Sequence, residues 1–296
     1  MKRYALSFLL LIWYDSVPAF PAPPEPVRLV FIAGPNDHCG ENPCHRYIED
    51  LTLLKECLVA LEGDITFDVT LYVGERPPVG TLDEVAAVVV HSSADRKLGE
   101  WHGLFPQNQD SAGYDAEYQQ FLEDFDAQIA RGMGLMVLHY STWVDHPTAQ
   151  ARYLEWIGGH YQRGQSRVDG DQSTDGTTAI ETVALARPDH PVLRGVTPWT
   201  TEAEYYYNLR FRDDDPRFTP LLTSDLPVDD PQTHTIAWCV ERADGGRGLG
   251  FTGAHSPRNM YLDDFRKFVL NAIAWTARVE VPRGGFTSVV SESANE

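Results

Sequence analysis

The chain has 296 residues, and Asp and Glu outnumber Lys and Arg by 43 to 24, which gives a formal net charge of −19 at pH 7. This acidic balance excludes the basic surface that nucleic-acid binding requires, and it disfavours contact with anionic membranes. The sequence contains no P-loop, no glycine-rich dinucleotide fingerprint and no G-x-S-x-G motif. We therefore expect no nucleotide cofactor and no serine nucleophile on a strand-to-helix elbow.

The N-terminal residues have the pattern of a processing signal. A short basic start precedes the apolar run Ala5–Tyr14, which is too short to span a bilayer, and Val17–Ala19 fits a small-residue cleavage site. We expect a signal peptide at 1–19, a Pro-rich linker at 20–26, one domain at 27–280 and a polar, frayed tail at 281–296. The mature protein is then expected to be periplasmic or secreted, with no membrane span.

The first half of the domain alternates strands with helices. Strands are predicted at Val27–Ala33, Ile65–Val73, Val85–Val90 and Gly134–Leu138, and helices at Leu51–Leu61 and Tyr118–Ile129. The fully apolar runs are typical of parallel strands that are buried on both faces. This order predicts an α/β fold with a flavodoxin-like, doubly wound, mostly parallel sheet.

The second half is richer in strands and ends in a helix. Strands are predicted at Ala179–Ala186, Phe218–Thr223, Thr235–Val240 and Gly248–Thr252, and an amphipathic helix at Tyr261–Ala277. Of the four cysteines, Cys39 and Cys44 share a loop and could form a disulfide in an exported chain. Cys57 and Cys239 fall on a helix and a strand, which favours buried thiols.

Several of the ten histidines follow predicted strands. His38 and His45 flank the loop after the first strand, and His91, His139 and His255 follow three others. The carboxyl ends of parallel strands meet at one edge of a sheet, where ligands bind in this class of fold. We therefore predict that these imidazoles lie along one edge, with Glu204 as the carboxylate candidate. A strand-end histidine can equally be an ordinary hydrogen-bonded loop residue, and Glu204 an ordinary exposed glutamate.

This set of residues allows two kinds of chemistry. Imidazoles with a carboxylate form the ligand set of a zinc-type site, for which the candidate ligands are His38, His45, His139 and His255. Without a metal, His139, His255 and Glu204 are candidate catalytic residues in acid–base chemistry. Tyr140, Trp143, Tyr206 and His91 are candidates for binding the substrate. The aromatic residues could instead belong to the core, and none of the spacings is a strong motif by itself.

Six segments taken together resemble the ThuA-like (trehalose utilisation) family. The strand that ends at His139 resembles its "G-x-G-h-h-h-l-H" element, and Glu202–Tyr206 resembles its "D-E-x-Y" motif, with Glu204 at the acidic position. Gly245–His255 resembles its glycine-rich "G-x-G-R-h-h-x-T-x-G-H" element. The other matching segments are Ile157–Tyr161, His190–Gly195 and Asn271–Trp275. The likeness covers residues 27 to 280 in order.

This resemblance implies a class I glutamine amidotransferase-like fold and carbohydrate metabolism through 3-keto-sugar intermediates, with zinc as a possible metal. Amidotransferases of this fold carry a cysteine at the elbow where this chain has His139, which argues against amidotransfer. The loop Asp37–His45 resembles an "S-H-G-x-G-x-H-E" loop of relatives, with Asp37 for Ser and Arg46 for Glu. Some relatives have another histidine two positions after His255, where this chain has Pro257.

Three functional hypotheses follow. The first is an exported enzyme that acts on a glycoside, such as a 3-keto-glycoside, by acid–base or metal-assisted chemistry. The second is a non-catalytic module that binds a sugar or a metal on the same fold. The third is a cysteine hydrolase, which would need Cys57 or Cys239 beside a histidine at the edge of the sheet.

Overall fold

The structure is a computed structural model that describes residues 25–39, 42–93, 104, 116–144, 147–162, 174–175 and 178–290. At 37–39, 42–44, 116–118 and 174–175 it describes the backbone alone. The predicted signal peptide at 1–19 and the beginning of the linker lie outside the described residues. No helix among the described residues is long and apolar enough to cross a membrane.

Nine strands of the described chain form one sheet in the order β10-β9-β13-β14-β15-β6-β5-β1-β4. The strands of this sheet are β1 (Val27–Ala33), β4 (Phe67–Val73), β5 (Ala87–His91), β6 (Gly134–Leu138), β9 (Ala179–Leu185), β10 (Trp199–Ala203), β13 (Phe218–Leu226), β14 (Gln232–Glu241) and β15 (Arg247–Phe251). The strands from β4 to β15 on one side are all parallel. The remaining pairings, from β15 to β10, are antiparallel.

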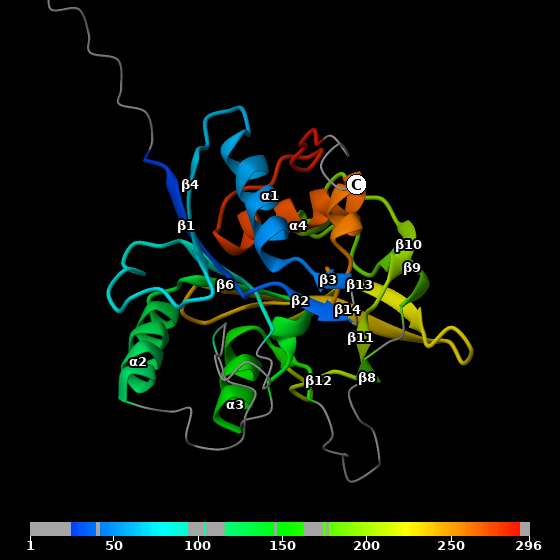
Figure 1. Ribbon diagram of the computed structural model, residues 1–296, viewed down its shortest axis with the longest axis horizontal. Coiled ribbons are helices and arrows are strands. Elements are labelled where there is room, and N and C mark those ends of the chain that lie inside the picture. Colours follow the sequence, from blue (N-terminus) through cyan, green and yellow to red (C-terminus); the bar gives the residue numbers. More distant parts are fainter. Residues whose placement is uncertain are drawn as a thin grey trace, which may run out of the picture.

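Helices cover both faces of the parallel part, as a doubly wound fold requires. Helices α1 and α4 lie on one face and α2 and α3 on the other (Figure 1). Their bounds are α1 (Tyr47–Val59), α2 (Ala116–Ala130), α3 (Pro147–Trp156) and α4 (Asp263–Thr276). Short 3₁₀ helices are η3 (His139–Thr142), η4 (Pro191–Leu193) and η5 (Pro257–Tyr261). The predicted α/β architecture is thus confirmed.

Small two-stranded sheets flank the main one. They pair β2 (Asp37–Cys39) with β3 (Asn42–His45), β7 (Gly159–His160) with β12 (Arg210–Phe211), and β8 (Thr174–Asp175) with β11 (Tyr206–Tyr207). The β2–β3 hairpin stands where the sequence predicts only a loop. Because β3 ends at His45, immediately before α1, the hairpin returns this histidine to the edge of the sheet.

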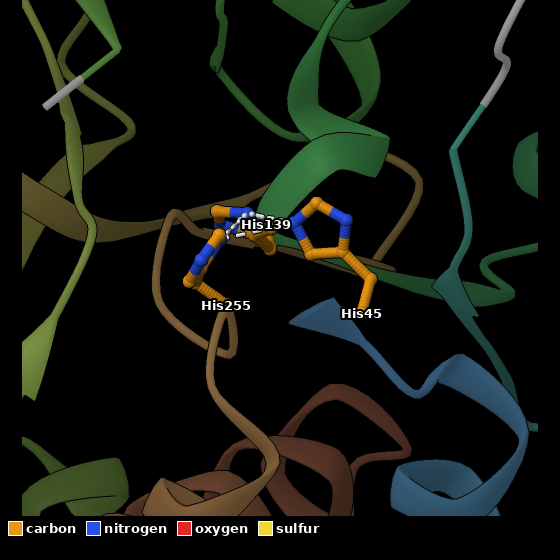
Figure 2. A group of neighbouring side chains, drawn as sticks. All are labelled: His45, His139 and His255. Carbon is orange, nitrogen blue, oxygen red and sulfur yellow. Dashed lines mark hydrogen bonds between the residues drawn. The ribbon is translucent and has the colours of Figure 1, made fainter. Parts of the chain in front are cut away.

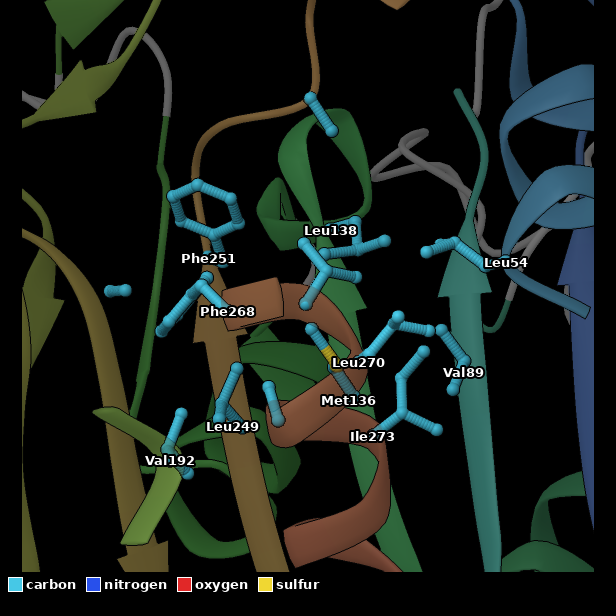
Figure 3. Packing of buried hydrophobic residues seen from close by; sticks show 14 of the residues in the cluster. Leu54, Val89, Met136, Leu138, Val192, Leu249, Phe251, Phe268, Leu270 and Ile273 are labelled. Carbon is cyan, nitrogen blue, oxygen red and sulfur yellow. The ribbon is translucent and has the colours of Figure 1, made fainter. Parts of the chain in front are cut away.

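Side chains of the central strands alternate between two apolar layers. Met136 and Leu138 of β6 pack towards α1 and α4, whereas Leu135 and Val137 pack towards α2 and α3. Figure 3 shows the first layer, in which Leu249 and Phe251 of β15 lie against α4. A strand with helices on both faces buries its alternating side chains on either side, which explains the apolar sequence of β6 and of β5 as far as Val90.

The residues that follow α4 differ from the predicted frayed tail. Val281 and Phe286 are buried. The backbone N–H of Phe286 donates to the side-chain oxygen of Asn271 in α4, 2.8 Å away, and its ring contacts Phe67 of β4. The hydrogen bond and the aromatic contact attach this segment to α4 and β4, so the chain as far as Phe286 is packed and not frayed.

The two cysteines whose side chains are described are free and buried, as predicted for Cys57 and Cys239. Cys239 lies in the middle of β14, with its sulfur 3.7 Å from His190 Nε2. Burial raises the pKa of this thiol, which disfavours the reactive thiolate. The cysteine-hydrolase hypothesis therefore has no support from Cys239. The proposed Cys39–Cys44 disulfide concerns side chains outside the described residues.

Arg242, which directly follows β14, bonds to the ends of α2 and α3 and to the residue before β6. Its guanidinium is 2 % exposed and donates to the backbone carbonyl oxygens of Ile129, Met133 and Trp156. These carbonyls lie near the carboxyl ends of α2 and α3, where the last carbonyls of a helix lack donors from a further turn, although Ile129 also accepts from the N–H of Gly132. Asp244 accepts from the same side chain at 3.1 Å.

We expect Arg242→Met to lower the free energy of unfolding by about 3 kcal/mol, because buried carbonyl oxygens lose their donors and Asp244 loses its partner. Arg212→Met is the matched control. Arg212 also bonds a carboxylate but is 45 % exposed, so its loss should cost less than about 1 kcal/mol. Urea unfolding of the three proteins measures both effects, and equal stability losses would contradict this account of Arg242.

Candidate metal centre

Three histidines meet at the carboxyl edge of the parallel strands. His45 ends β3, in the connection from β1 to α1. His139 directly follows β6, and His255 lies four residues after β15, the strand that pairs with β6. Figure 2 shows their rings converging from three separate segments. These residues lie far apart in sequence and only the sheet brings them together.

The converging atoms are three ring nitrogens. His45 Nε2 lies 3.1 Å from His139 Nε2 and 3.0 Å from His255 Nδ1, and the latter two atoms are 3.3 Å apart. In a tetrahedral zinc site with Zn–N bonds of about 2.0–2.1 Å, ligand nitrogens lie roughly 3.3–3.4 Å apart. The observed triangle is only slightly tighter than that, so a small cation at its centre fits the three nitrogen donors.

The hydrogen bonds of His139 fix which of its nitrogens faces the triangle. Its Nδ1–H donates to the backbone carbonyl of Thr252 at 2.7 Å. Burial, followed by the charges of His45 and His255, lowers the pKa of His139 well below 6.5. The ring is therefore neutral, and Nε2 presents a lone pair to the centre. A backbone carbonyl that holds the outer nitrogen of a histidine in this way is typical of metal ligands.

Hydrogen bonding alone cannot satisfy the three nitrogens. His139 Nε2 carries no proton, and each of the other two nitrogens carries at most one when its ring is neutral. The three mutual contacts cannot then all be donor–acceptor pairs. A cation at the centre satisfies three lone pairs at once, which is the physical reason to assign this cluster as a candidate metal site. Among the described histidine, cysteine and acidic side chains, these three form a group in which one ligand atom of each residue lies within 4.8 Å of the others.

The backbone is strained at two points beside the ligands. His139 has φ of 47° and Ala254, immediately before His255, has φ of 79°. Residues other than glycine rarely adopt this left-handed backbone conformation, and those that do are concentrated at functional sites. At His139 the strain turns the chain sharply from β6 into η3 and directs the imidazole to the edge of the sheet.

Two polar side chains contact the triangle from the segment after β10: Glu204 lies between β10 and β11, and Tyr206 begins β11. Glu204 Oε2 lies 3.4 Å from His255 Nδ1, and the hydroxyl of Tyr206 donates to His139 Nε2 at 3.2 Å. Burial, then the charge of Glu204, raises the pKa of Tyr206 well above 10, so the hydroxyl keeps its proton. The centre thus has a carboxylate and a hydroxyl donor beside its three nitrogens.

Exposure of the side chains shows from which direction the centre can be reached. His139 is fully buried and His45 is 5 % exposed, whereas the side chains of His255 and Glu204 are 12 % and 18 % exposed. Access therefore runs past His255 and Glu204. Three protein nitrogens leave at least one position of a tetrahedral ion open, as in catalytic zinc sites.

Aromatic rings border the same centre. Tyr206 stacks on His139 with centroids 4.6 Å apart, and Tyr140 contacts His45 edge-on at 5.8 Å. Tyr140 also contacts Trp143 at 5.1 Å. Tyr140 and Trp143 are half-buried and Tyr206 is buried. The exposed parts of Tyr140 and Trp143 therefore offer aromatic surface to a ligand on this side of the centre.

One predicted site residue, His91, lies outside this group. His91 is fully buried, and its Nε2 faces Asp50 Oδ2 at 3.2 Å. It therefore fits the alternative of a hydrogen-bonded strand-end histidine better than contact with a substrate. The backbone of His38 lies in β2, but its side chain is outside the described residues, so its predicted role as a ligand stays a prediction.

Sequence reasoning did not identify Tyr47 and Asp50, which lie beside the centre. Both are buried on α1. Tyr47 stacks on His45 with centroids 5.3 Å apart and an interplanar angle of 14°. A signal for Asp50 is present in the sequence, because its position falls on the apolar face marked by Leu51 and Leu54. A carboxylate on the buried face of a helix requires a buried partner.

Fold and site together define a doubly wound α/β protein with a candidate three-histidine metal centre. The sequence profile of the ThuA family, described as trehalose utilisation, matches residues 80–276. The chain therefore belongs to the ThuA family. No curated protein matches the sequence significantly.

Solved structures agree with this assignment at the level of the fold. A ThuA-like protein from Parabacteroides merdae ATCC 43184 has 15 % identity and a TM-score of 0.57, and the match covers 90 % of this chain and 94 % of that one. A ThuA-like protein from Bacteroides uniformis ATCC 8492 has 14 % identity and a TM-score of 0.57, covering 88 % and 95 %. The predicted family resemblance is confirmed.

We expect the purified protein to bind one divalent cation per chain, and His139→Ala to weaken that binding strongly. Loss of an outer-shell partner already costs roughly 10–100-fold in affinity, so loss of a direct ligand should cost more. Titration with Zn²⁺ against a competing chelator measures the constant. His234→Ala is the control, since His234 is half-buried and contacts Tyr207 rather than the triangle. Equal weakening in both variants would contradict the assignment.

Proposed function

We propose that this protein is an exported, metal-assisted enzyme that acts on a carbohydrate, with a 3-keto-glycoside as the substrate class. The observation that carries the proposal is the triangle of His45, His139 and His255 nitrogens with Glu204 and Tyr206 beside it. Membership of a family described as trehalose utilisation supports a sugar as the substrate.

The donor set supports zinc as the metal. Three imidazole nitrogens with space for a fourth ligand suit zinc better than calcium or magnesium, which prefer oxygen ligands. Bound there, the ion would act as a Lewis acid that polarises a substrate oxygen. Glu204 Oε2, at 3.4 Å from His255 Nδ1, is close enough to serve either as a fourth ligand or as a base.

We assign the proton transfer to Glu204. A carbonyl group makes the proton on the neighbouring carbon acidic, and the carboxylate on the accessible side of the centre would remove that proton. The electron pair of the C–H bond then moves towards the carbonyl oxygen, which becomes an oxyanion. When a metal takes the lone pair of His139 Nε2, the hydroxyl of Tyr206, which keeps its proton, would donate a hydrogen bond to this oxyanion instead. As the carbonyl re-forms, the electron pair makes a double bond to the anomeric carbon and the bond from that carbon to the glycosidic oxygen breaks. The aglycone would then leave with the proton that Glu204 took up.

The aromatic surface supports a sugar as the ligand. Tyr140 and Trp143 lie next to the centre and are half-buried, so part of each ring is open to contact. Sugar rings have apolar C–H faces that pack on aromatic side chains, while their hydroxyl groups need polar partners. The proposed active site offers aromatic rings and polar groups next to the histidine triangle.

The N-terminal sequence is the basis for proposing that the protein is exported. Protein recovered from the periplasm or medium of expressing bacteria is expected to begin at Phe20 when its amino terminus is sequenced, because Val17–Ala19 fits a cleavage site. Retention of Met1 in protein that stays with the cytosolic fraction would remove this part of the proposal.

The enzymatic proposal predicts that zinc-loaded protein releases the aglycone from a 3-keto-glucoside, as measured by sugar and aglycone analysis. Glu204→Gln should lower kcat by about 10²–10⁴-fold, the usual range for loss of a general base. Zinc affinity of the same variant separates the two roles: a base leaves affinity nearly unchanged, whereas a fourth ligand does not. Chelation should abolish turnover.

Glu202→Gln is the matched control, because Glu202 lies two residues earlier, exposed in β10, and its loss should leave kcat unchanged. If the zinc-loaded protein binds the keto-sugar without releasing product, the enzymatic proposal fails and a non-catalytic binding module takes its place. If it neither binds nor converts the sugar, the substrate class is wrong.

A further inference from the structure

A chain of contacts leads from the metal centre to a buried carboxylate on α1. His45 stacks on Tyr47, with centroids 5.3 Å apart. The other side of Tyr47 meets His91 edge-on, with centroids 4.7 Å apart and an interplanar angle of 89°. His91 Nε2 lies 3.2 Å from Asp50 Oδ2. None of Tyr47, Asp50 and His91 is more than 3 % exposed.

The Asp50–His91 contact connects α1 to the middle of the sheet. His91 ends β5, which lies between β1 and β6. Asp50 lies in the first turn of α1, where its N–H donates to the carbonyl oxygen of Arg46. His45 is two residues before the first residue of that helix. A bond that fixes the first turn of α1 against β5 therefore also fixes the place from which His45 reaches the centre.

Asp50 is the polar contact that holds the His91 ring. Among the described residues, His91 Nδ1 has no hydrogen-bond partner, which leaves Nε2 as the atom through which the ring is oriented. One proton lies between Nε2 and Oδ2 whichever of the two groups carries it, so the bond persists in either arrangement. Burial raises the pKa of Asp50, and the bond to His91 opposes this effect.

We propose that Asp50 and His91 form a positioning pair that holds Tyr47, and through its ring the imidazole of His45, in the orientation that a bound cation requires. This inference rests on the proposed function, in which His45 is a metal ligand. The pair does not touch the reacting atoms. It acts on the site through a packed aromatic ring, as outer-shell partners of metal ligands commonly act through hydrogen bonds.

Binding of Co²⁺ tests the positioning pair without any substrate. The affinity measures how well the ligands are pre-arranged, and the visible d–d absorption of bound Co²⁺ reports their geometry. We expect Asp50→Ala to weaken Co²⁺ binding by roughly 10–100-fold and to alter the d–d band at saturating metal. Asp50→Asn keeps an acceptor for His91 Nε2–H and should restore both the affinity and the spectrum to near those of wild type.

Glu49→Gln is the matched control, because Glu49 is an exposed carboxylate in the same turn of α1 and its loss removes the same charge. It should change neither readout. If Asp50→Ala does not fold, His91→Gln replaces it: glutamine can still donate to Asp50 but offers Tyr47 no ring, so binding should again weaken.

Wild-type affinity and spectrum in both Asp50→Ala and His91→Gln would overturn the positioning pair while leaving the metal centre intact. Weak binding in Asp50→Asn that equals that of Asp50→Ala would also overturn it, because the retained hydrogen bond would then have no effect. Failure of the wild-type protein to bind Co²⁺ would instead overturn the proposed function, and the positioning pair with it.

Discussion

The parallel alignment of β1, β5, β6 and β15 is the constraint on which the candidate metal centre depends. Ala33 pairs with His91, His91 with Leu138, and Leu138 with Phe251, so four strands end along one line. Each ligand then needs only a short connection to reach a common point. A slip of one residue in any of these pairings would turn the apolar side chains of that strand to the opposite face and displace its ligand. The apolar layers on both faces therefore fix the geometry of the polar edge.

The two halves of the sheet contribute different parts of the centre. The parallel half carries the three histidines, whereas Glu204 follows β10, the outermost antiparallel strand, and Tyr206 begins the next strand, β11. In this segment, Glu204 contacts His255 and Tyr206 contacts His139. The positions of the three nitrogens consequently depend on the parallel strands, while the positions of the carboxylate and the hydroxyl depend on the antiparallel part of the domain. Sequence changes in the antiparallel part would then alter the chemistry around the triangle without disturbing the triangle itself.

Much of the parallel half could be predicted from sequence, because uninterrupted apolar runs such as that of β6 arise only from burial on two faces. The edge location of His45, His139 and His255 followed from the ends of those strands. The β2–β3 hairpin was missed since its sequence is rich in Gly, Asn and Pro, which also favour loops. His91 could not be separated from the ligands by position alone, because its neighbour Asp50 lies in another element. Pairing of buried polar groups across elements is a tertiary property that the local pattern does not encode.

The separation of the ligands along the chain has a consequence for folding. His45 and His139 are 94 residues apart, His139 and His255 are 116, and His45 and His255 are 210. An unfolded chain cannot bring these nitrogens together, so a cation that binds the triangle binds the folded state alone. At a free concentration of a thousand times Kd, such a ligand stabilises the fold by about 4 kcal/mol. The ion would act as a reversible cross-link closing two long loops, and the supply of metal where the chain folds would set how much native protein accumulates.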